Sequence, residues 1–203
     1  AAVPVTLGGD GSVTLPQLRS AARSHGPLAL VHIDAHTDTG PGKTSGELSP
    51  STTFTRAAEE GLLDMKRAFH IGVRGTQRFK DVIPFSCDLG FEVITGGELF
   101  RRGMSETGAY LRQRIGDRPA YLCFDMDFLD PSCAPGVCQP ECGGATAREG
   151  LDLLQSLAGT KFAVFDINTV SPPQDIGGMT ALLAARVLLE CLALACQTRS
   201  GTS

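Results

Sequence analysis

The sequence predicts an α/β fold of three layers, in which helices cover a mostly parallel sheet. Apolar runs rich in β-branched residues alternate with amphipathic segments along the 203 residues, which is typical of parallel strands joined by helices. In addition, acidic side chains directly follow two of the apolar runs, and ligands in such sheets bind beyond the carboxyl ends of the strands. The alternation and the position of the acidic residues therefore support the same fold.

Each element follows from one of these two patterns. Strands are assigned to the apolar runs near residues 3–7, 28–33, 68–73, 91–95, 119–125 and 161–167. Helices are assigned to the amphipathic segments near residues 14–25, 54–63, 98–115, 146–158 and 179–197. The last helix carries leucines and alanines on most of its surface, which predicts a core or subunit-contact helix. The Gly/Pro/Ser-rich segment from Gly40 to Ser51 predicts a loop over the site.

Composition indicates an ordinary globular chain. An apolar fraction of 42% with 20% charged residues, and no repeat or long linker, predicts a single domain over residues 1–203. A formal charge of −4 gives no support to nucleic-acid binding. We expect no membrane span, because no stretch approaches the required length, and no leader is visible at the start. Cytoplasmic localisation is expected, or mitochondrial localisation if a targeting segment was lost.

The seven cysteines are an odd number, so a complete set of intrachain disulfides is impossible and reduced thiols fit best. Cys133, Cys138 and Cys142 cluster in one predicted loop, but their gaps do not match the spacing of common zinc sites. Cys123, Cys191 and Cys196 lie in apolar runs and are expected in the core.

Potential metal ligands follow two strands. Asp34, His36 and Asp38 come after the apolar segment 28–33, and Asp125 and Asp127 lie at the end of the apolar strand expected near 119–125. In an extended chain, side chains at every second position share a face, so each set is expected to converge on one point. The sequence therefore predicts a shared cation site.

These acidic residues have two other possible roles, in a helix cap or in a turn. Acidic residues at strand ends often cap the next helix or begin a turn. However, this many carboxylates behind such apolar strands would leave buried charges unpaired without a cation or several donors. His32 is on the same face but deeper, and it is expected to be a packed, hydrogen-bonded side chain. His70 and His25, at a strand end and a helix end, are given solvent or capping roles.

These motifs resemble the ureohydrolase family of arginases, agmatinases and guanidino-acid hydrolases. The matching segments are 34–38 (Asp-Ala-His-Thr-Asp), 124–131 (Phe-Asp-Met-Asp-Phe-Leu-Asp-Pro), 134–136 with 143–144, 170–173 and 180–185. They follow the family order from near residue 5 to near residue 195. The resemblance implies an arginase-like fold. Family members are longer, so the N-terminal elements of that fold are expected to be missing.

The resemblance also implies the chemistry. Two Mn²⁺ ions would be bridged by a hydroxide, and this hydroxide would attack the carbon of a guanidinium group and release urea. Asp34 and Asp125 would bridge the ions, His36 and Asp127 would complete one of them, and Asp38 would serve the other. The expected partners are a small guanidino substrate and further copies of the chain in a homo-oligomer.

Three departures from the family pattern affect this transfer. Gly11 replaces the histidine that is the family's first metal ligand, so one ion loses its imidazole. Pro50 replaces a loop histidine proposed as a proton shuttle. Thr169 stands where arginases have a glutamate that contacts the guanidinium, and a threonine hydrogen-bonds this group without supplying charge.

The segment 168–173 resembles the guanidino-acid branch, such as guanidinobutyrase and guanidinopropionase, which is the preferred substrate class. Arg74 and Arg78 are guesses for a residue that receives the substrate carboxylate, although solvated surface arginines are favoured. Glu141 lies in a loop that the family brings near the metals, which hints at a supporting role.

Three functions follow. The first is a metal-dependent amidinohydrolase in which Asp38 and Thr169 take part in catalysis. The second is a catalytically impaired relative with a damaged metal site, since Gly11 and Pro50 replace histidines. The third is a single-metal deacylase like the histone deacetylases, with Asp34, His36 and Asp125 as ligands, but the tandem histidines of those enzymes are absent.

Overall fold

The computed structural model describes residues 2–41, 49–77 and 79–200. Its six-stranded sheet has the strand order β1-β6-β5-β2-β3-β4, and all of its described pairings are parallel. The strands are β1 (Val5–Leu7), β2 (Leu28–Ile33), β3 (Leu63–Val73), β4 (Glu92–Thr95), β5 (Ala120–Asp125) and β6 (Phe162–Asn168). The predicted α/β fold with a mostly parallel sheet is confirmed.

Seven α-helices accompany the sheet in the described residues, together with short 3-10 turns. The helices are α1 (Thr14–His25), α2 (Thr53–Glu59), α3 (Val82–Asp88), α4 (Gly96–Arg102), α5 (Met104–Ile115), α6 (Ala147–Ser156) and α7 (Met179–Ser200). The turns are η1 (Gly11–Val13), η2 (Pro50–Thr52), η3 (Met126–Phe128) and η4 (Pro172–Gln174).

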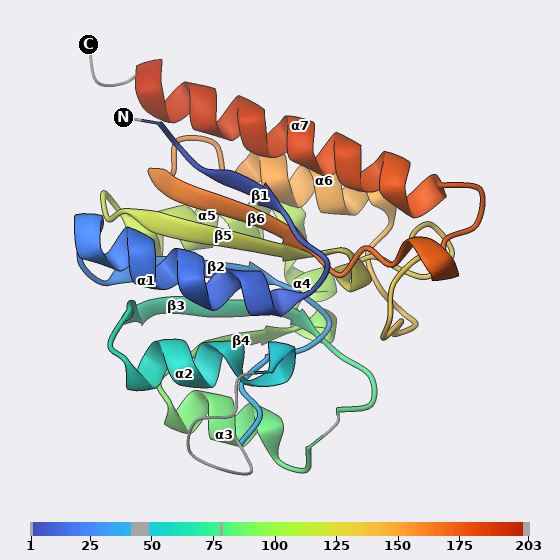
Figure 1. Ribbon diagram of the computed structural model, residues 1–203, viewed down its shortest axis with the longest axis horizontal. Helices are drawn as coiled ribbons and strands as arrows, with labels where there is room; N and C mark the ends of the chain where they lie inside the picture. Colours follow the sequence, from blue (N-terminus) through green and yellow to red (C-terminus); the bar gives the residue numbers. More distant parts are fainter. Residues whose placement is uncertain (1, 42–48, 78, 201–203) are drawn as a thin grey trace.

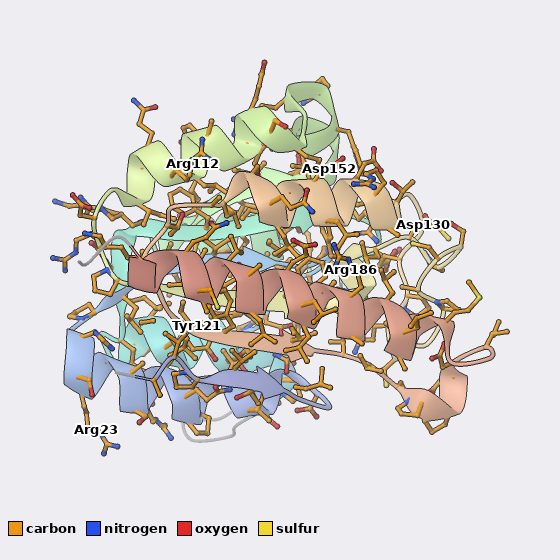
Figure 2. All side chains as sticks on the ribbon, turned by 90° about the horizontal axis from the view of Figure 1, so that it is seen from above. Arg23, Arg112, Tyr121, Asp130, Asp152 and Arg186 are labelled. Atoms are coloured by element: carbon orange, nitrogen blue, oxygen red, sulfur yellow. The ribbon has the colours of Figure 1, made fainter. Side chains whose placement is uncertain are left out.

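The helices form a layer on each side of the sheet. Figure 1 shows α1 and α2 in front of the strands and α4, α5 and α6 behind them. Seen from above in Figure 2, α7 lies beside α6 and α5, with α1 at the opposite side. Neighbouring residues of β2 face different cores: Val31 packs with the α4–α7 layer and Leu30 with the α1–α2 layer. Because both faces are covered, most residues of the central strands β2 and β5 are apolar.

The structure corrects several predicted boundaries. β3 begins at Leu63 rather than near 68, because its first residues pair with β2 although their side chains are largely polar. The predicted helix 98–115 is two helices, which separate at Gly103, where φ is 90°. The predicted helix 54–63 ends at Glu59. The short helix α3 was not predicted. Residues 42–48 of the predicted loop lie outside the described residues.

Helix α7 corrects the expectation about membrane spans. Met179–Gln197 is long and apolar enough to cross a membrane by length and composition, with a mean hydropathy of 1.9. One side of this helix packs onto the sheet and α6 through buried residues that include Val187 and Cys191. Leu182 is 74% exposed on another side, and Cys196, expected in the core, is exposed. The prediction of a core helix therefore holds for one side of α7.

Candidate metal centre

The residues after β2 reach the site through a bend. Asp34 is buried, and its backbone N–H donates to the carbonyl of Ile71 (3.0 Å), which continues the pairing with β3 for one residue. The chain then leaves the sheet, and Asp38 adopts a left-handed conformation with φ of 49°. The predicted extended spacing of Asp34, His36 and Asp38 is therefore wrong. Their side chains approach the site because the backbone turns.

The second set also departs from an extended chain. Asp125 is the last residue of β5, whereas Asp127 lies in η3, and both side chains are buried. The turn at η3 is supported from β6, because the backbone N–H of Met126 donates to Thr169 Oγ1 (2.8 Å). Since β2 and β5 are adjacent and parallel, the two sets meet at one edge of the sheet.

Two groups of potential ligands share Asp34. In the first, ligand atoms of Asp34, His36 and Asp127 lie within 4.8 Å of one another. His36 Nδ1 is 3.3 Å from Asp34 Oδ1 and 3.5 Å from Asp127 Oδ2. In the second, Asp34 is grouped with Asp38 and His32 within the same limit. Asp34 thus stands between two positions at which a cation could be held.

Asp125 has different neighbours from those expected. Its Oδ2 lies 3.3 Å from His32 Nε2 and 3.2 Å from Cys123 Sγ, and these residues form a third potential ligand group. Its Oδ1 is buried and has no hydrogen-bond partner among the described residues. His32 and Cys123 therefore contact Oδ2 of Asp125, while Oδ1 is left for a further partner.

Burial and mutual repulsion shape the charges of these carboxyl groups. Burial raises the pKa of Asp125 to about 6, with the charge on Asp34 adding to the effect. Burial and the Asp34 charge likewise raise the pKa of Asp38 and Asp127 well above the usual value. For Asp34, burial is outweighed by the close imidazoles of His32 and His36, which hold its pKa well below the usual value.

The same two influences, burial and neighbouring charge, act on the pKa of the His36 imidazole with opposite signs. Burial lowers its pKa, but hydrogen bonding and charge from Asp127 and Asp34 outweigh burial and raise it to about 11. The buried carboxyl groups thus oppose one another's ionisation, whereas His36 favours the ionised form of its acidic neighbours.

The residues fit a bound divalent cation. Asp125 Oδ1 and Asp127 Oδ1 are buried without hydrogen-bond partners in the described chain, and an orphaned carboxylate oxygen is costly unless a cation or donor meets it. The donor set of carboxylate oxygens and an imidazole suits Mn²⁺, and zinc or iron have similar preferences.

A pocket of about 250 Å³ opens above these groups. Its lining includes Asp34, His36, Asp38, Asp127 and Thr169, together with residues 9–11, 49–51 and 138–139. Gly11 and Pro50, the two positions at which the sequence resemblance implies histidines in the family, both lie in this lining. A Cβ atom built at Gly11 would lie 3.2 Å from Asp38 Oδ2, so a side chain there would begin beside that carboxylate.

Thr169 reaches the pocket in a strained conformation, with φ of 68°. Its hydroxyl donates to the carbonyl of Asn168 (2.8 Å) and accepts from the N–H of Met126. The hydroxyl proton is therefore already used, and only an oxygen lone pair is left to accept a hydrogen bond from a guanidinium group.

Two residues have roles that the sequence did not reveal. His70 is fully buried inside β3, so the predicted solvent or capping role is wrong. Arg74 is half-buried, and its Nη2 donates to the backbone carbonyls of Asp127 (2.9 Å) and Glu141 (2.7 Å). Arg74 is thus neither a solvated surface residue nor free to receive a substrate carboxylate, and Arg78 lies outside the described residues. An arginine whose partners are backbone carbonyls cannot be recognised from a single sequence, because any residue provides such a carbonyl.

The supporting role suggested for Glu141 stays a prediction. Its backbone carbonyl accepts from Arg74, and its carboxylate lies against Gly75, since a Cβ atom built there would meet Glu141 Oε2.

Comparisons with known proteins agree with this geometry. Residues 1–194 match the arginase family. The human mitochondrial guanidino acid hydrolase is 40% identical over 190 residues, which are 94% of this chain and 54% of that protein. The mitochondrial agmatinase of Gallus gallus is also 40% identical over 190 residues, covering 94% of this chain and 56% of that protein.

Among solved structures, the proclavaminate amidino hydrolase of Streptomyces clavuligerus superimposes with a TM-score of 0.91 at 37% identity. The match covers 96% of this chain and 64% of that one. The chain thus spans little more than half the length of the curated relatives described above. Family match, sequence identity and superposition agree, and the chain belongs to the arginase family.

Proposed function

We propose that this chain carries the catalytic centre of a metal-dependent amidinohydrolase that cleaves a linear guanidino compound to urea and an amine. The observation that carries the proposal is the group of Asp34, His36 and Asp127, with Asp38 close to Asp34, beside buried carboxylate oxygens without partners. When bound, Mn²⁺ would lower the pKa of water so that hydroxide is available near neutral pH. Family membership supports the same class of reaction.

The residues would divide the work as follows. Asp34, His36 and Asp127 hold one ion, and Asp38 with Asp34 and Asp125 serves the other. The guanidinium plane of the substrate occupies the pocket, where Thr169 Oγ1 accepts a hydrogen bond from it. Because Pro50 carries no proton, Asp38 is the carboxylate in the lining that is placed to pass a proton towards the leaving amine.

Two classes of substrate tail are considered, one that carries a carboxylate and one that carries a positive charge. The segment 168–173 resembles guanidino-acid hydrolases, which favours a tail with a carboxylate. However, the described lining contains no lysine or arginine, and Asp10 lies in it, which favours a cationic tail such as that of agmatine.

The second candidate is a catalytically impaired member of the family, and a specific observation favours it. Gly11 and Pro50 both line the pocket, and neither offers a ligand atom or a titratable group. Assembly into a homo-oligomer, and cytoplasmic or mitochondrial localisation, stay predictions for either candidate.

Urea release tests both candidates. Metal-free protein is incubated with agmatine, 4-guanidinobutyrate, 3-guanidinopropionate and arginine, with and without added Mn²⁺. Urea formed from agmatine or a guanidino acid only when Mn²⁺ is present supports the amidinohydrolase. Folded protein that binds Mn²⁺ but forms no urea from any of the four supports the impaired relative.

A further inference from the structure

A row of buried polar residues crosses the sheet below the candidate metal centre. His70 of β3, His32 of β2, Cys123 of β5 and Asp166 of β6 are in register on adjacent strands. All four are at most 1% exposed. The row lies two residues before Asp34 and Asp125 on their strands, on the face covered by α1 and α2. Such a polar row is unusual between apolar layers, where unpaired donors and acceptors are costly.

His32 connects this row to both carboxylates. Its Nε2 lies 3.0 Å from Asp34 Oδ2 and 3.3 Å from Asp125 Oδ2, so the N–H is shared between them. Neither contact is aligned as a full hydrogen bond, which is consistent with a position between two acceptors. One donor thereby sets the separation of two carboxylates that come from different strands.

His70 fixes the orientation of that donor. The Nδ1 atoms of His32 and His70 are 2.8 Å apart, so one proton lies between the two rings. The rings are also packed by aromatic neighbours: the centroids of His32 and Phe54 are 4.3 Å apart, and those of His70 and Phe91 are 4.4 Å apart. The contact with His70 and the packing of Phe54 thus fix the ring plane of His32, while its Nε2 faces the carboxylates.

The pair has little to offer to folding itself. His70 Nε2 is buried and has no hydrogen-bond partner among the described residues, which costs stability that an apolar ring at the same position would not cost. A purely structural explanation would favour phenylalanine beside Phe54 and Phe91. Residues that hold ligands of a metal, by contrast, are hydrogen-bonded to them and tune their orientation.

We propose that His32, oriented by His70, is a positioning residue that fixes the carboxylates of Asp34 and Asp125 for the divalent cation. The inference rests on the proposed function, because it assigns a role toward the cation of that site. His32 itself contributes no ligand atom: its Nε2 faces the inner oxygens, and Asp125 Oδ1 is left for the ion.

Four variants test the proposal through the affinity for Mn²⁺, measured by the electron paramagnetic resonance signal of the free ion. His32→Gln places an amide near the position of Nε2 and keeps a donor for the carboxylates, whereas His32→Asn places it near Nδ1 and loses that donor. His70→Phe keeps the aromatic packing and removes the Nδ1 contact. His25→Ala is the control, because His25 is exposed at the end of α1.

We expect His32→Asn and His70→Phe to weaken Mn²⁺ binding by about 10- to 100-fold. His32→Gln should retain more of the affinity than His32→Asn, and His25→Ala should bind as the wild type does. The melting temperature of metal-free His70→Phe should be unchanged or higher. A structural role predicts the reverse, a lower melting temperature with an unaltered affinity of the folded fraction, and that result would overturn the proposal.

The failure of this inference is distinguishable from failure of the proposed function. If the wild type binds Mn²⁺ and all four variants bind it equally well, the positioning role is wrong and the proposed function is untouched. If the wild type binds Mn²⁺ without releasing urea, the proposed function fails, and the order of affinities among the variants still decides the role of His32.

Discussion

The floor and the wall of the pocket are built in different ways. The floor consists of Asp34, His36, Asp38 and Asp127, which follow the central strands β2 and β5, together with Asp125, which ends β5 and lies outside the lining. The wall consists of residues 9–11, 49–51 and 138–139, which belong to short turns and loops. Floor residues are mostly buried and contact one another, whereas several wall residues are exposed or half-buried.

This difference explains where the chain departs from its family. A change in the floor alters charges that are buried beside the sheet, so it affects several pKa values and contacts together. A change in the wall, such as glycine at position 11 or proline at position 50, removes a side chain from a turn and leaves the sheet intact. Changes in the wall are therefore expected to leave the fold and the buried floor in place.

The largest expected effect comes from the floor. Asp125→Asn removes one negative charge and is expected to weaken Mn²⁺ binding by more than about 100-fold, as measured by calorimetric titration. Because burial raises the pKa of Asp125, its ionised form opposes folding, and the metal-free variant should be at least as stable as the wild type. The control is Asp152→Asn, which lies on the surface of α6, away from the site (Figure 2). Unchanged Mn²⁺ content would contradict a ligand role for Asp125.

The second prediction concerns the link between floor and wall. Arg74 binds the backbone carbonyl of Asp127 in the floor turn and those of Glu141 and Cys142 beside the wall. Arg74→Ala should lower the free energy of unfolding by about 2 kcal/mol, because the partly buried carbonyls of Asp127 and Glu141 lose a charged donor. Arg74→Lys should restore only part of this, since an ammonium group does not reach all three carbonyls.

Guanidinium chloride denaturation measures both Arg74 variants. Arg23→Ala is a suitable control, because Arg23 points away from the molecule at the end of α1 (Figure 2). Equal midpoints for Arg74→Ala and Arg23→Ala would show that the carbonyl contacts of Arg74 add nothing to stability.

The third prediction restores the wall. Gly11→His places an imidazole beside Asp38, and no positive φ opposes a side chain at this position. Asp38 has to move by a few tenths of an ångström, because the Cβ atom would lie 3.2 Å from its Oδ2. We expect a gain in Mn²⁺ affinity of about tenfold from an added ligand, or roughly 1.4 kcal/mol. Gly11→Ala, which fills the same space without an imidazole, is the control.

Adding Pro50→His should raise the rate of urea release rather than the affinity, because the second imidazole carries a proton. If the double variant gained neither affinity nor rate, these two positions would not correspond to the family histidines.

The sequence predicted the floor better than the rest of the site. The uninterrupted apolar runs before Asp34 and Asp125 required covered parallel strands, and their adjacency brought both sets of carboxylates to one edge. The predicted extended backbone from Asp34 to Asp38 was wrong, however, because a hydrophobic pattern does not reveal a left-handed residue such as Asp38. His70 was missed because a lone polar residue in an apolar run gives no signal of burial, and Arg74 was missed because its partners are backbone atoms.

The smallest predicted effect concerns Asp130, which holds the loop that carries the wall residues 138–139. Its Oδ1 accepts from the N–H of Ser132 (3.0 Å), and its Oδ2 accepts from those of Gly143 (2.9 Å) and Gly144 (3.1 Å). Hydrogen bonds from Ser132, followed by those from Gly144 and Gly143, lower the pKa of Asp130 to about 2. Figure 2 shows Asp130 at the opposite end of the molecule from Arg23.

The sign of the pH dependence follows from this shift. A depressed pKa means that the carboxylate stabilises the fold at every pH above its unfolded value of about 3.9, and that this stabilisation is lost as pH falls from there towards 2. Because the group is largely exposed, the effect should stay below about 1 kcal/mol. In chemical denaturation, the difference between wild type and Asp130→Asn should be constant from about pH 5 to 8 and shrink between about pH 4 and 2. A difference that persists unchanged at about pH 2 would mean that the asparagine disturbs the loop by its shape rather than by loss of charge. Charge would then matter less for this loop of the wall than it does for the carboxylates of the floor.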